Sequence, residues 1–261
     1  MSHSFILETV ADLRRKQLAR LTAIATAALE VFTRDGFGSA QVVDIARRAE
    51  LSVGTLYLYA DSKQALFELA VQAAAFGIDV ACDVDPTSLP LRARGMDATA
   101  VFVEDGIRQR AHWPVLKAAL RVSAPPDVDA EVAAVVGEMF DLLSRERPMI
   151  WLLDRCAWEL PRLREVYVER ARQPYFDDIA RYVRRRRSAP LGRRGEQPAA
   201  IGRAVVEMVA WMAMHRARDP VAQPFDTAAA RYACIALASG GLLGTPAPSR
   251  RRLRSVMSGA S

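Results

Sequence analysis

The sequence predicts an all-α fold: a small N-terminal three-helix domain that contains a helix-turn-helix, followed by a larger helical domain. Apolar residues recur every three or four positions along most of the chain, which is the spacing of one face of an α-helix. Alternation of apolar and polar residues with a β-branched bias never persists as it does in a half-buried strand. Residues 40–63 combine two short helical patterns with a tight turn between them.

The first helix is expected over residues 17–35, because its leucines fall on one face. Gly36 is expected to end that helix in a left-handed conformation, which glycine adopts without a Cβ penalty. Residues 1–16 end in the basic run RRK and are expected to form a mobile or partly helical arm. Two interpretations of the arm stay open: contact with phosphates or the minor groove of DNA, or a solvated start of the first helix.

The segment that follows is expected to carry the function. The second helix is expected over 41–48 and the third over 52–59, with Ser52 as the N-cap of the third because its hydroxyl can accept a backbone N–H. Leu56 can turn inward, but the other side chains of so short a helix cannot all be buried. The outer side therefore presents glycine, threonine and tyrosine, which gain more from a DNA groove and its phosphates than from water.

The rest of the chain is expected to be helical. Pro174 lies inside one of the helical patterns and predicts a kink or break there. Residues 184–198 are rich in Arg, Gly and Pro and are expected to form an exposed loop, and the tail after Gly240 is expected to be disordered. The expected helices are 62–80, 91–111, 114–123, 127–145, 148–159, 161–187, 198–217 and 226–240.

Composition and charge narrow the function classes. The formal net charge of +6 suggests an anionic partner, but residues 1–70 hold eight basic and eight acidic residues, so the basic excess lies later in the chain. Support for DNA binding therefore comes from the motif rather than from charge. No run of 18 uncharged apolar residues occurs, so no membrane contact is expected.

The chain offers little for metal binding, disulfides or catalysis. Its three cysteines and three histidines are scattered, which predicts neither a metal site nor a disulfide framework and suits a reducing cytoplasm. Nucleophile-elbow, zinc-protease, Walker A and dinucleotide-binding motifs are absent from the sequence. We therefore expect no catalytic residues, no metal and no cofactor.

The run that begins at Asp44-Ile45-Ala46 and continues through the Ser52-x-Gly54-Thr55-Leu56-Tyr57-x-Tyr59 pattern to Ser62-Lys63 resembles the helix-turn-helix of the TetR/AcrR transcriptional regulators. The preceding helix, closed by Gly36-Phe37, fits as well, and the resemblance covers about residues 15–70. It implies DNA contacts in the major groove, on its rims or on phosphates. The residues at the matching positions are Gln41, Ser52, Val53, Gly54, Thr55, Tyr57, Tyr59 and Lys63.

Three positions depart from the family pattern. Ala40 stands where a capping Thr or Ser is usual, so Ser39 takes over the cap or the second helix frays. Glu50 stands where the turn usually has Gly, so Glu50 is strained or the turn has another shape. Ala60 replaces a usual Phe and leaves less to pack against the fourth helix.

The resemblance also implies an effector site between residues 90 and 187 and a dimer interface made by helices 198–217 and 226–240. The large apolar residues could line a cavity for a mostly apolar small molecule, or they could simply fill the core. Likewise, the last two helices could form an internal hairpin instead of a dimer interface. The residues that would line the cavity are Phe102, Trp113, Met139, Phe140, Trp151, Trp158 and Tyr175.

The expected function is a ligand-responsive transcriptional regulator, by the family's habit a repressor, that binds a double-stranded DNA operator as a homodimer. The alternative is an all-α ligand-binding or scaffolding protein whose helix-turn-helix no longer binds DNA. The expected domains are an arm with the DNA-binding domain over 1–62, an effector and dimerisation domain over 63–245, and a tail over 246–261.

Overall fold

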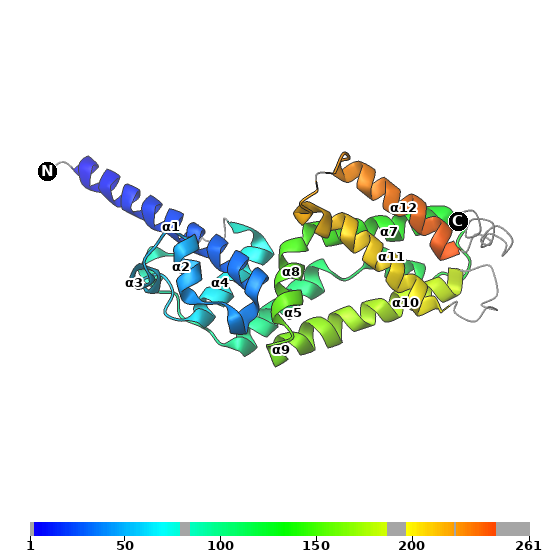
Figure 1. Cartoon of the computed structure of the whole chain (residues 1–261), viewed down its shortest axis with the longest axis horizontal. Helices are drawn as coiled ribbons and strands as arrows, with labels where there is room; N and C mark the ends of the chain where they lie inside the picture. The colour runs from blue at the N-terminus through cyan, green and yellow to red at the C-terminus, as the bar shows by residue number, and fades with distance from the viewer. Residues whose placement is uncertain (1–2, 79–83, 187–196, 222, 244–261) are drawn as a thin grey trace, which may run out of the picture. The chain divides into compact units, whose positions relative to one another are not determined.

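The computed structural model describes residues 3–78, 84–186, 197–221 and 223–243 (Figure 1). Within these ranges the regular secondary structure is helical, apart from one isolated bridge between Ala60 and Leu91. The expected all-α class is confirmed. The chain folds as two compact units, and each unit combines segments that are far apart in the sequence.

The first unit contains the chain up to His112 together with Arg145–Arg172. Its long first helix extends with its N-terminal turns beyond the other helices of the unit (Figure 1). The elements of this unit are α1 (His3–Ser39), α2 (Val42–Arg48), α3 (Val53–Tyr57), α4 (Lys63–Phe76), the 3-10 turn η2 (Pro86–Ser88), α5 (Met96–Arg110), α8 (Arg147–Cys156), α9 (Pro161–Arg164) and the π-helix η3 (Glu165–Arg172).

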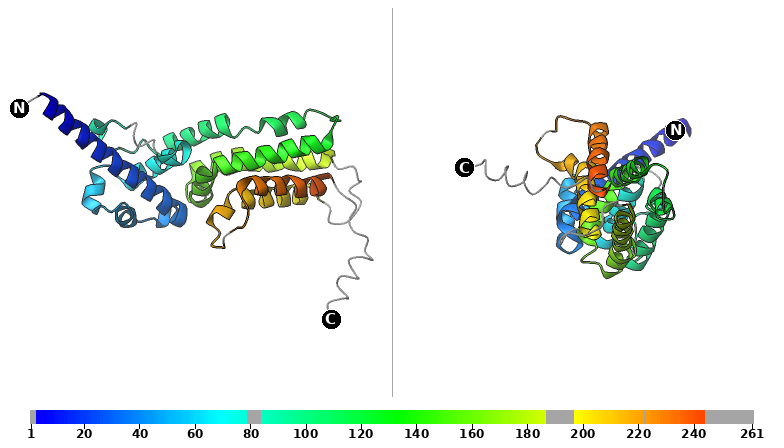
Figure 2. Two further views of the ribbon diagram at one scale, coloured as in Figure 1. Left: turned by 90° about the horizontal axis from the view of Figure 1, so that it is seen from above. Right: turned by 90° about the vertical axis from the view of Figure 1, so that its right-hand side faces the viewer.

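The second unit contains Trp113–Ser144 and the described residues from Gln173 to Leu243. Its four longer helices, α7, α10, α11 and α12, run side by side (Figure 2). The elements of this unit are α6 (Pro114–Ala119), α7 (Val128–Arg145), α10 (Gln173–Arg186), α11 (Pro198–Ala213), the 3-10 turn η4 (His215–Arg218) and α12 (Thr227–Leu243).

These units differ from the expected domain boundaries. The helix-turn-helix does not form a compact unit that ends at residue 62, because α1 and α4 both pack against α8, which comes some 80 residues later. The expected tail over 246–261 lies outside the described residues. The first compact unit is therefore larger than a three-helix DNA-binding domain.

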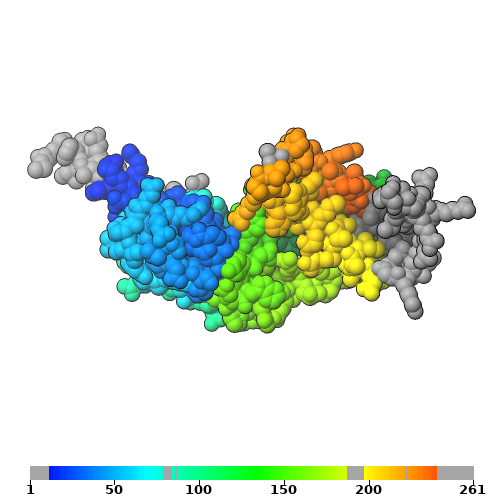
Figure 3. All heavy atoms as spheres, in the orientation of Figure 1, coloured from blue at the N-terminus to red at the C-terminus, as the bar shows by residue number. Residues whose placement is uncertain are grey.

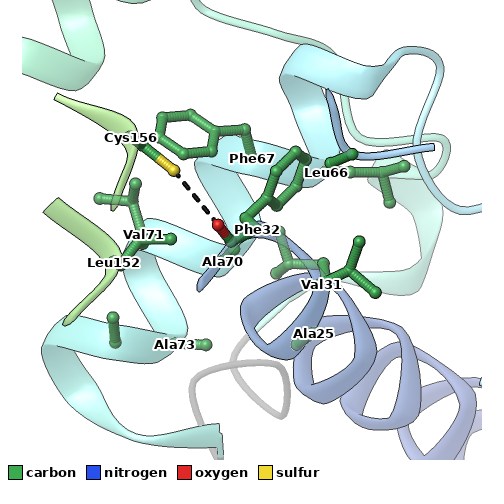
Figure 4. Close-up of a cluster of buried hydrophobic side chains, with 14 of the residues drawn as sticks. Ala25, Val31, Phe32, Leu66, Phe67, Ala70, Val71, Ala73, Leu152 and Cys156 are labelled. Atoms are coloured by element: carbon green, nitrogen blue, oxygen red, sulfur yellow. Dashed lines mark hydrogen bonds between the residues drawn. The ribbon is translucent and has the colours of Figure 1, made fainter. Parts of the chain in front are cut away.

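The core of the first unit is aromatic where α1, α4 and α8 meet. Phe32 and Phe67 are fully buried and meet edge to face with ring centroids 5.2 Å apart, and Phe37 lies 5.2 Å from Phe67. The Cys156 thiol donates to the Phe32 carbonyl oxygen at 3.4 Å (Figure 4). Burial raises the pKa of this thiol to about 12, so Cys156 stays protonated and acts as a packing residue.

Gly36 bends α1 near its end. Its φ of 84° is positive, as expected, but its ψ of 174° lies outside the expected left-handed helical conformation. This combination is open essentially to glycine alone. The chain is therefore turned sharply before α2, and the helix continues to Ser39 on the far side of the bend.

The expected irregularity at Pro174 takes the form of a π-helix. Residues 165–172 form π turns directly before α10, and Pro174 lies in the first turn of α10, where its missing N–H is tolerated. The loop was expected to begin at residue 184, but residues 184–186 are still helical, because α10 continues to Arg186. Arg186 is only 5% exposed, since it pairs with Glu131 and donates to the carbonyl oxygens of Ala119 and Val122. Residues 187–196 lie outside the described part of the chain.

Candidate nucleic-acid interface

Ser52 caps the third helix, as expected. Its hydroxyl oxygen accepts from the Thr55 backbone N–H at 3.0 Å and lies 2.8 Å from the Thr55 hydroxyl. The cap therefore occupies both hydroxyl groups, which fixes the start of α3 and leaves the Thr55 methyl group as the part of that side chain not used in the cap. At its own N-terminus α2 has no side-chain cap, so Ser39 does not replace the missing one.

The turn between α2 and α3 is strained at Glu50. This residue has a φ of 57°, the left-handed conformation that the departure from glycine had suggested. The turn keeps its backbone bonds, since the Leu51 N–H donates to the Ala46 carbonyl oxygen at 2.9 Å. A residue with a Cβ in this conformation costs on the order of 1–2 kcal/mol.

Glu50→Gly is therefore expected to stabilise the first unit. Relief of the strain exceeds the extra chain entropy that glycine brings to the unfolded state, so the free energy of unfolding should rise by about 0.5–1 kcal/mol. Glu50→Ala is the matched control, because it removes the carboxylate but keeps the Cβ. The free energies of unfolding of both variants are measured by chemical denaturation. If the two variants were equally stabilised, the cost at Glu50 would come from its carboxylate side chain and not from its backbone conformation.

The outer face of the motif is apolar. Gly54, Tyr57 and Leu58 lie at helical spacing on one side of α3, and Tyr57 and Leu58 are 42% and 67% exposed. Gln41 and Val43, at the start of α2, are exposed as well, and Val43 reaches 48%. Sequence reasoning missed Val43 and Leu58, although an apolar residue in the outer register of a short amphipathic helix is a usable signal.

Two of the expected contact residues are turned inward. Tyr59 is only 5% exposed and belongs to the core cluster, against which Leu91 also packs; its carbonyl oxygen accepts from the Leu91 N–H at 2.8 Å. Val53 is half-buried and packs against the core of the unit. We therefore correct the expected set by removing Tyr59, whose side chain belongs to the core.

The cations between residues 40 and 63 are all engaged within the protein. Arg47 pairs with Asp44 at 2.8 Å, and Arg48 pairs with Glu30 of α1. The Lys63 ammonium donates to the Gly38 carbonyl oxygen at 3.0 Å and lies 5.1 Å from the centroid of the Phe37 ring. The centre of the motif therefore exposes an apolar surface. Its positive charges lie at the edges, where each is bound by another group of the protein.

The comparisons with known proteins agree with this geometry. Residues 24–70 match the family model described as "Bacterial regulatory proteins, tetR family", and this range begins within α1 and runs through α2 and α3 into α4. Residues 24–70 of the chain therefore form a DNA-binding domain of the TetR family. This domain supports the coarse role of a DNA-binding transcriptional regulator.

Two solved structures are similar to this chain at a low level. One, from Mesorhizobium loti MAFF303099, carries the provisional name of a TetR-family transcriptional regulator; it is 17% identical with a TM-score of 0.40, over 85% of this chain and 95% of that one. The other, from Clostridium perfringens, carries the provisional name of a fatty acid metabolism regulator; it is 16% identical with a TM-score of 0.39, over 87% and 100%. At these scores neither adds to the assignment, which rests on residues 24–70. No curated protein matches the sequence.

The residues expected to line an effector cavity divide between the two units of the protein. Met139 and Phe140 are each 1% exposed and fill the core of the second unit, while Trp158 is 67% exposed and cannot line an enclosed cavity. Trp113 and Tyr175 stack on each other in the second unit, with ring centroids 4.1 Å apart. The first unit holds Phe102, Trp151 and Trp158, and the second holds Trp113, Met139, Phe140 and Tyr175.

Other classes of site find no support in the part of the chain that the structure describes. His, Cys, Asp and Glu side chains form no group of three or more that could hold a metal ion there. In the same residues, no helix has both the length and the apolar character that a membrane span needs.

Proposed function

We propose that this regulator is a repressor that binds its operator as a homodimer and is released by a small, mostly apolar effector. DNA binding follows from the family; repression, effector and dimer are the proposed parts. The observation that supports an effector site is a buried tyrosine hydroxyl in the second unit.

The proposed DNA contacts are Gln41, Val43, Gly54, the Thr55 methyl group, Tyr57 and Leu58. Exposed apolar groups on a recognition helix can contact thymine methyl groups in the major groove, and Gly54 lets the backbone approach closely. We propose that Tyr57 and the start of α2 with Gln41 contact phosphates, because hydroxyl groups and the N-terminus of a helix can donate to them. Because the cations of the motif are paired, fit to the groove rather than charge is expected to dominate recognition.

The Tyr175 hydroxyl supports an effector site. It is buried, and among the described residues it has no hydrogen-bond partner. Its ring stacks on Trp113, a residue with a φ of 52°, which is a strained conformation for a side chain of this size. A buried hydroxyl without a partner costs about 1–3 kcal/mol, and a ligand that supplies the missing hydrogen bond recovers that cost.

Charge near Tyr175 restricts the effector. Burial, with a smaller contribution from Glu138, raises the pKa of the Tyr175 phenol well above its ordinary value, so the hydroxyl is a neutral donor. The Glu138 carboxylate accepts from the backbone N–H groups of Val115 and Leu116 at 2.8 and 3.0 Å. An anionic ligand would be repelled by that carboxylate, so we propose an uncharged, mostly apolar effector with one hydrogen-bond acceptor.

The proposed dimer interface uses α11 and α12, which lie next to each other on one face of the second unit (Figure 3). Trp211, Tyr232 and Leu237 on these helices are 41%, 74% and 65% exposed. Pairing with the same two helices of a second copy would form a four-helix bundle and bury these side chains. The test is sedimentation of the full chain at micromolar concentration, and a monomer there would overturn the dimer.

The test of DNA binding is selection of bound duplexes from a random-sequence library by the full chain. A regulator selects one motif with two half-sites about one helical turn apart. A scaffolding protein selects none, and that result would favour the alternative. The selected duplex then serves to screen uncharged apolar compounds for release from DNA. Tryptophan fluorescence, to which Trp113 is one of four contributors, is a second signal.

Tyr175→Phe has a distinctive expected result. Without an effector, removal of the unpaired hydroxyl should raise the free energy of unfolding by about 1 kcal/mol. Compounds that release the wild-type protein from the selected duplex should require roughly tenfold higher concentration with the variant, the loss of one hydrogen bond. Tyr182→Phe is the matched control: its hydroxyl lies 3.1 Å from the Glu131 carboxylate, so its removal should destabilise the protein. Equal destabilisation by both changes would mean that the Tyr175 hydroxyl is satisfied.

A further inference from the structure

The backbone of Gly38 is held from two sides. Its N–H donates to Glu159, just beyond the end of α8, at 2.5 Å, and its carbonyl oxygen accepts from Lys63 at 3.0 Å. Both polar groups of this residue are thus bound by charged side chains, and each such bond is roughly twice as strong as a neutral one. Gly38 also has little room for a side chain, since a Cβ there would lie 3.2 Å from Glu159 Oε2.

A second contact from the same end of α8 fastens the preceding turn of α1. Arg155 donates to the carbonyl oxygens of Arg34 at 3.3 Å and Asp35 at 2.5 Å, which are carbonyls left open where α1 bends at Gly36. Its guanidinium also lies 3.3 Å from the Glu159 carboxylate, so the two side chains hold each other in place.

The backbone that is held leads directly into the helix-turn-helix. Gly38 comes three residues before Gln41, the N-cap of α2, which lacks a side-chain cap of its own. The α2 and α3 helices have only seven and five residues, and helices this short take their orientation from tertiary contacts. The position of Gly38 thus sets the direction in which α2, and α3 after it, face the DNA.

We propose that Lys63, Arg155 and Glu159 form a clamp on the 34–38 segment that positions the helix-turn-helix for DNA. Lys63 then acts on DNA through Gly38 and not through a phosphate. Arg155 and Glu159 lie at or just beyond the end of α8, some 120 positions later in the sequence than the backbone that they bind. The clamp therefore makes the affinity for DNA depend on the position of α8. This inference needs the DNA binding established for the family, and it stands whether or not an effector exists.

Glu159→Ala gives the clearest test, because the clamp and simple electrostatics predict opposite changes in the affinity for DNA. Removal of an anion from a DNA-binding unit would by itself raise the affinity for DNA. Loss of the clamp instead lowers the affinity for the selected duplex. The expected decrease is roughly tenfold, if the free energy of one hydrogen bond to a charged group is lost. Glu159→Gln keeps an oxygen that can accept from Gly38 and should recover most of the affinity. Glu169→Ala is the matched control, because it removes the same charge from an exposed site of the same unit without touching the clamp, and it should not lower the affinity.

Lys63→Met separates positioning from phosphate contact through the salt dependence. A phosphate contact contributes about one unit to the slope of log affinity against log salt concentration. The clamp predicts weaker binding with the slope unchanged, because Lys63 neutralises no phosphate. Hydrogen exchange at the Gly38 amide should accelerate in Glu159→Ala. All affinities are measured at a temperature where circular dichroism shows each variant fully folded, so that lost stability does not mimic lost positioning.

Three results would overturn the clamp. They are a rise in affinity with Glu159→Ala, a drop of about one unit in the salt slope with Lys63→Met, and additive effects of these two changes in a double-mutant cycle. Additive effects would contradict the clamp, because two side chains that bind the same residue should show a coupling free energy. If instead the wild-type chain selected no duplex at all, DNA binding itself would fail, and the exchange of the Gly38 amide would still report whether the clamp exists.

Discussion

Phe67→Ala is expected to lower the free energy of unfolding of the first unit by about 3–5 kcal/mol. The ring is fully buried and meets both Phe32 and Phe37 edge to face at 5.2 Å. Truncation removes the transfer free energy of a phenyl ring and leaves a cavity where α1, α4 and α8 converge (Figure 4). Such a loss is a large part of the total stability of a typical domain, so the variant should unfold at much lower denaturant concentration.

Phe76→Ala is the matched control on the same helix. Phe76 is 62% exposed; it touches the Phe102 ring at 5.6 Å and lies under the Arg110 guanidinium at 5.5 Å. Its truncation should cost about 1 kcal/mol, the worth of an exposed aromatic pair. Urea titrations followed by circular dichroism compare the two variants. Equal losses would mean that the aromatic cluster of α1 and α4 is not the core of the unit.

Gly36→Ala is expected to impair both folding and DNA binding. The position has a φ of 84° and a ψ of 174°, a backbone region that costs a residue with a Cβ about 1–3 kcal/mol. An alanine Cβ would also lie 2.4 Å from Glu159 Oε1 and 3.0 Å from the Arg155 guanidinium, so these two of the three clamp side chains must move. We expect a loss of about 3 kcal/mol in the free energy of unfolding, and weaker binding of the selected duplex at temperatures where the variant is folded.

Gly77→Ala isolates the backbone part of that effect. Gly77 has nearly the same conformation, with a φ of 90° and a ψ of 167°, but among the described residues its would-be Cβ meets no atom within 4 Å beyond its chain neighbours and its own helix. It should therefore lose only about 1–2 kcal/mol of stability and keep wild-type affinity for DNA. Matching DNA affinities for the Gly36 and Gly77 variants would show that displacement of Arg155 and Glu159 is without consequence for the helix-turn-helix.

The helices themselves could be predicted from local sequence. Periodic apolar residues placed them within a few positions, with the largest differences at the start of α1 and the start of α5. The cap at Ser52, the strain at Glu50 and the irregularity at Pro174 could also be predicted. Each of these depends on the residue itself and on neighbours a few positions away, through steric limits on the backbone or one short hydrogen bond.

Side-chain direction on the short helix α3 needed the tertiary structure. Tyr57 and Tyr59 both read as outward-facing, yet Tyr59 is buried because the segment at Leu91 packs over it. Lys63 read as a phosphate contact, yet its ammonium is bound to Gly38. A helix of five residues has no pattern long enough to fix its buried face, so a distant segment decides it.

The sequence by itself determined that this chain is all-α and carries a TetR-type helix-turn-helix, because helical periodicity, capping and turn chemistry are written in neighbouring residues. Only the tertiary structure decided that α8 belongs with the DNA-binding helices and that Arg155 and Glu159 grip the backbone before α2. Those contacts join residues some 120 positions apart, and no local pattern encodes which surface helix will meet which turn.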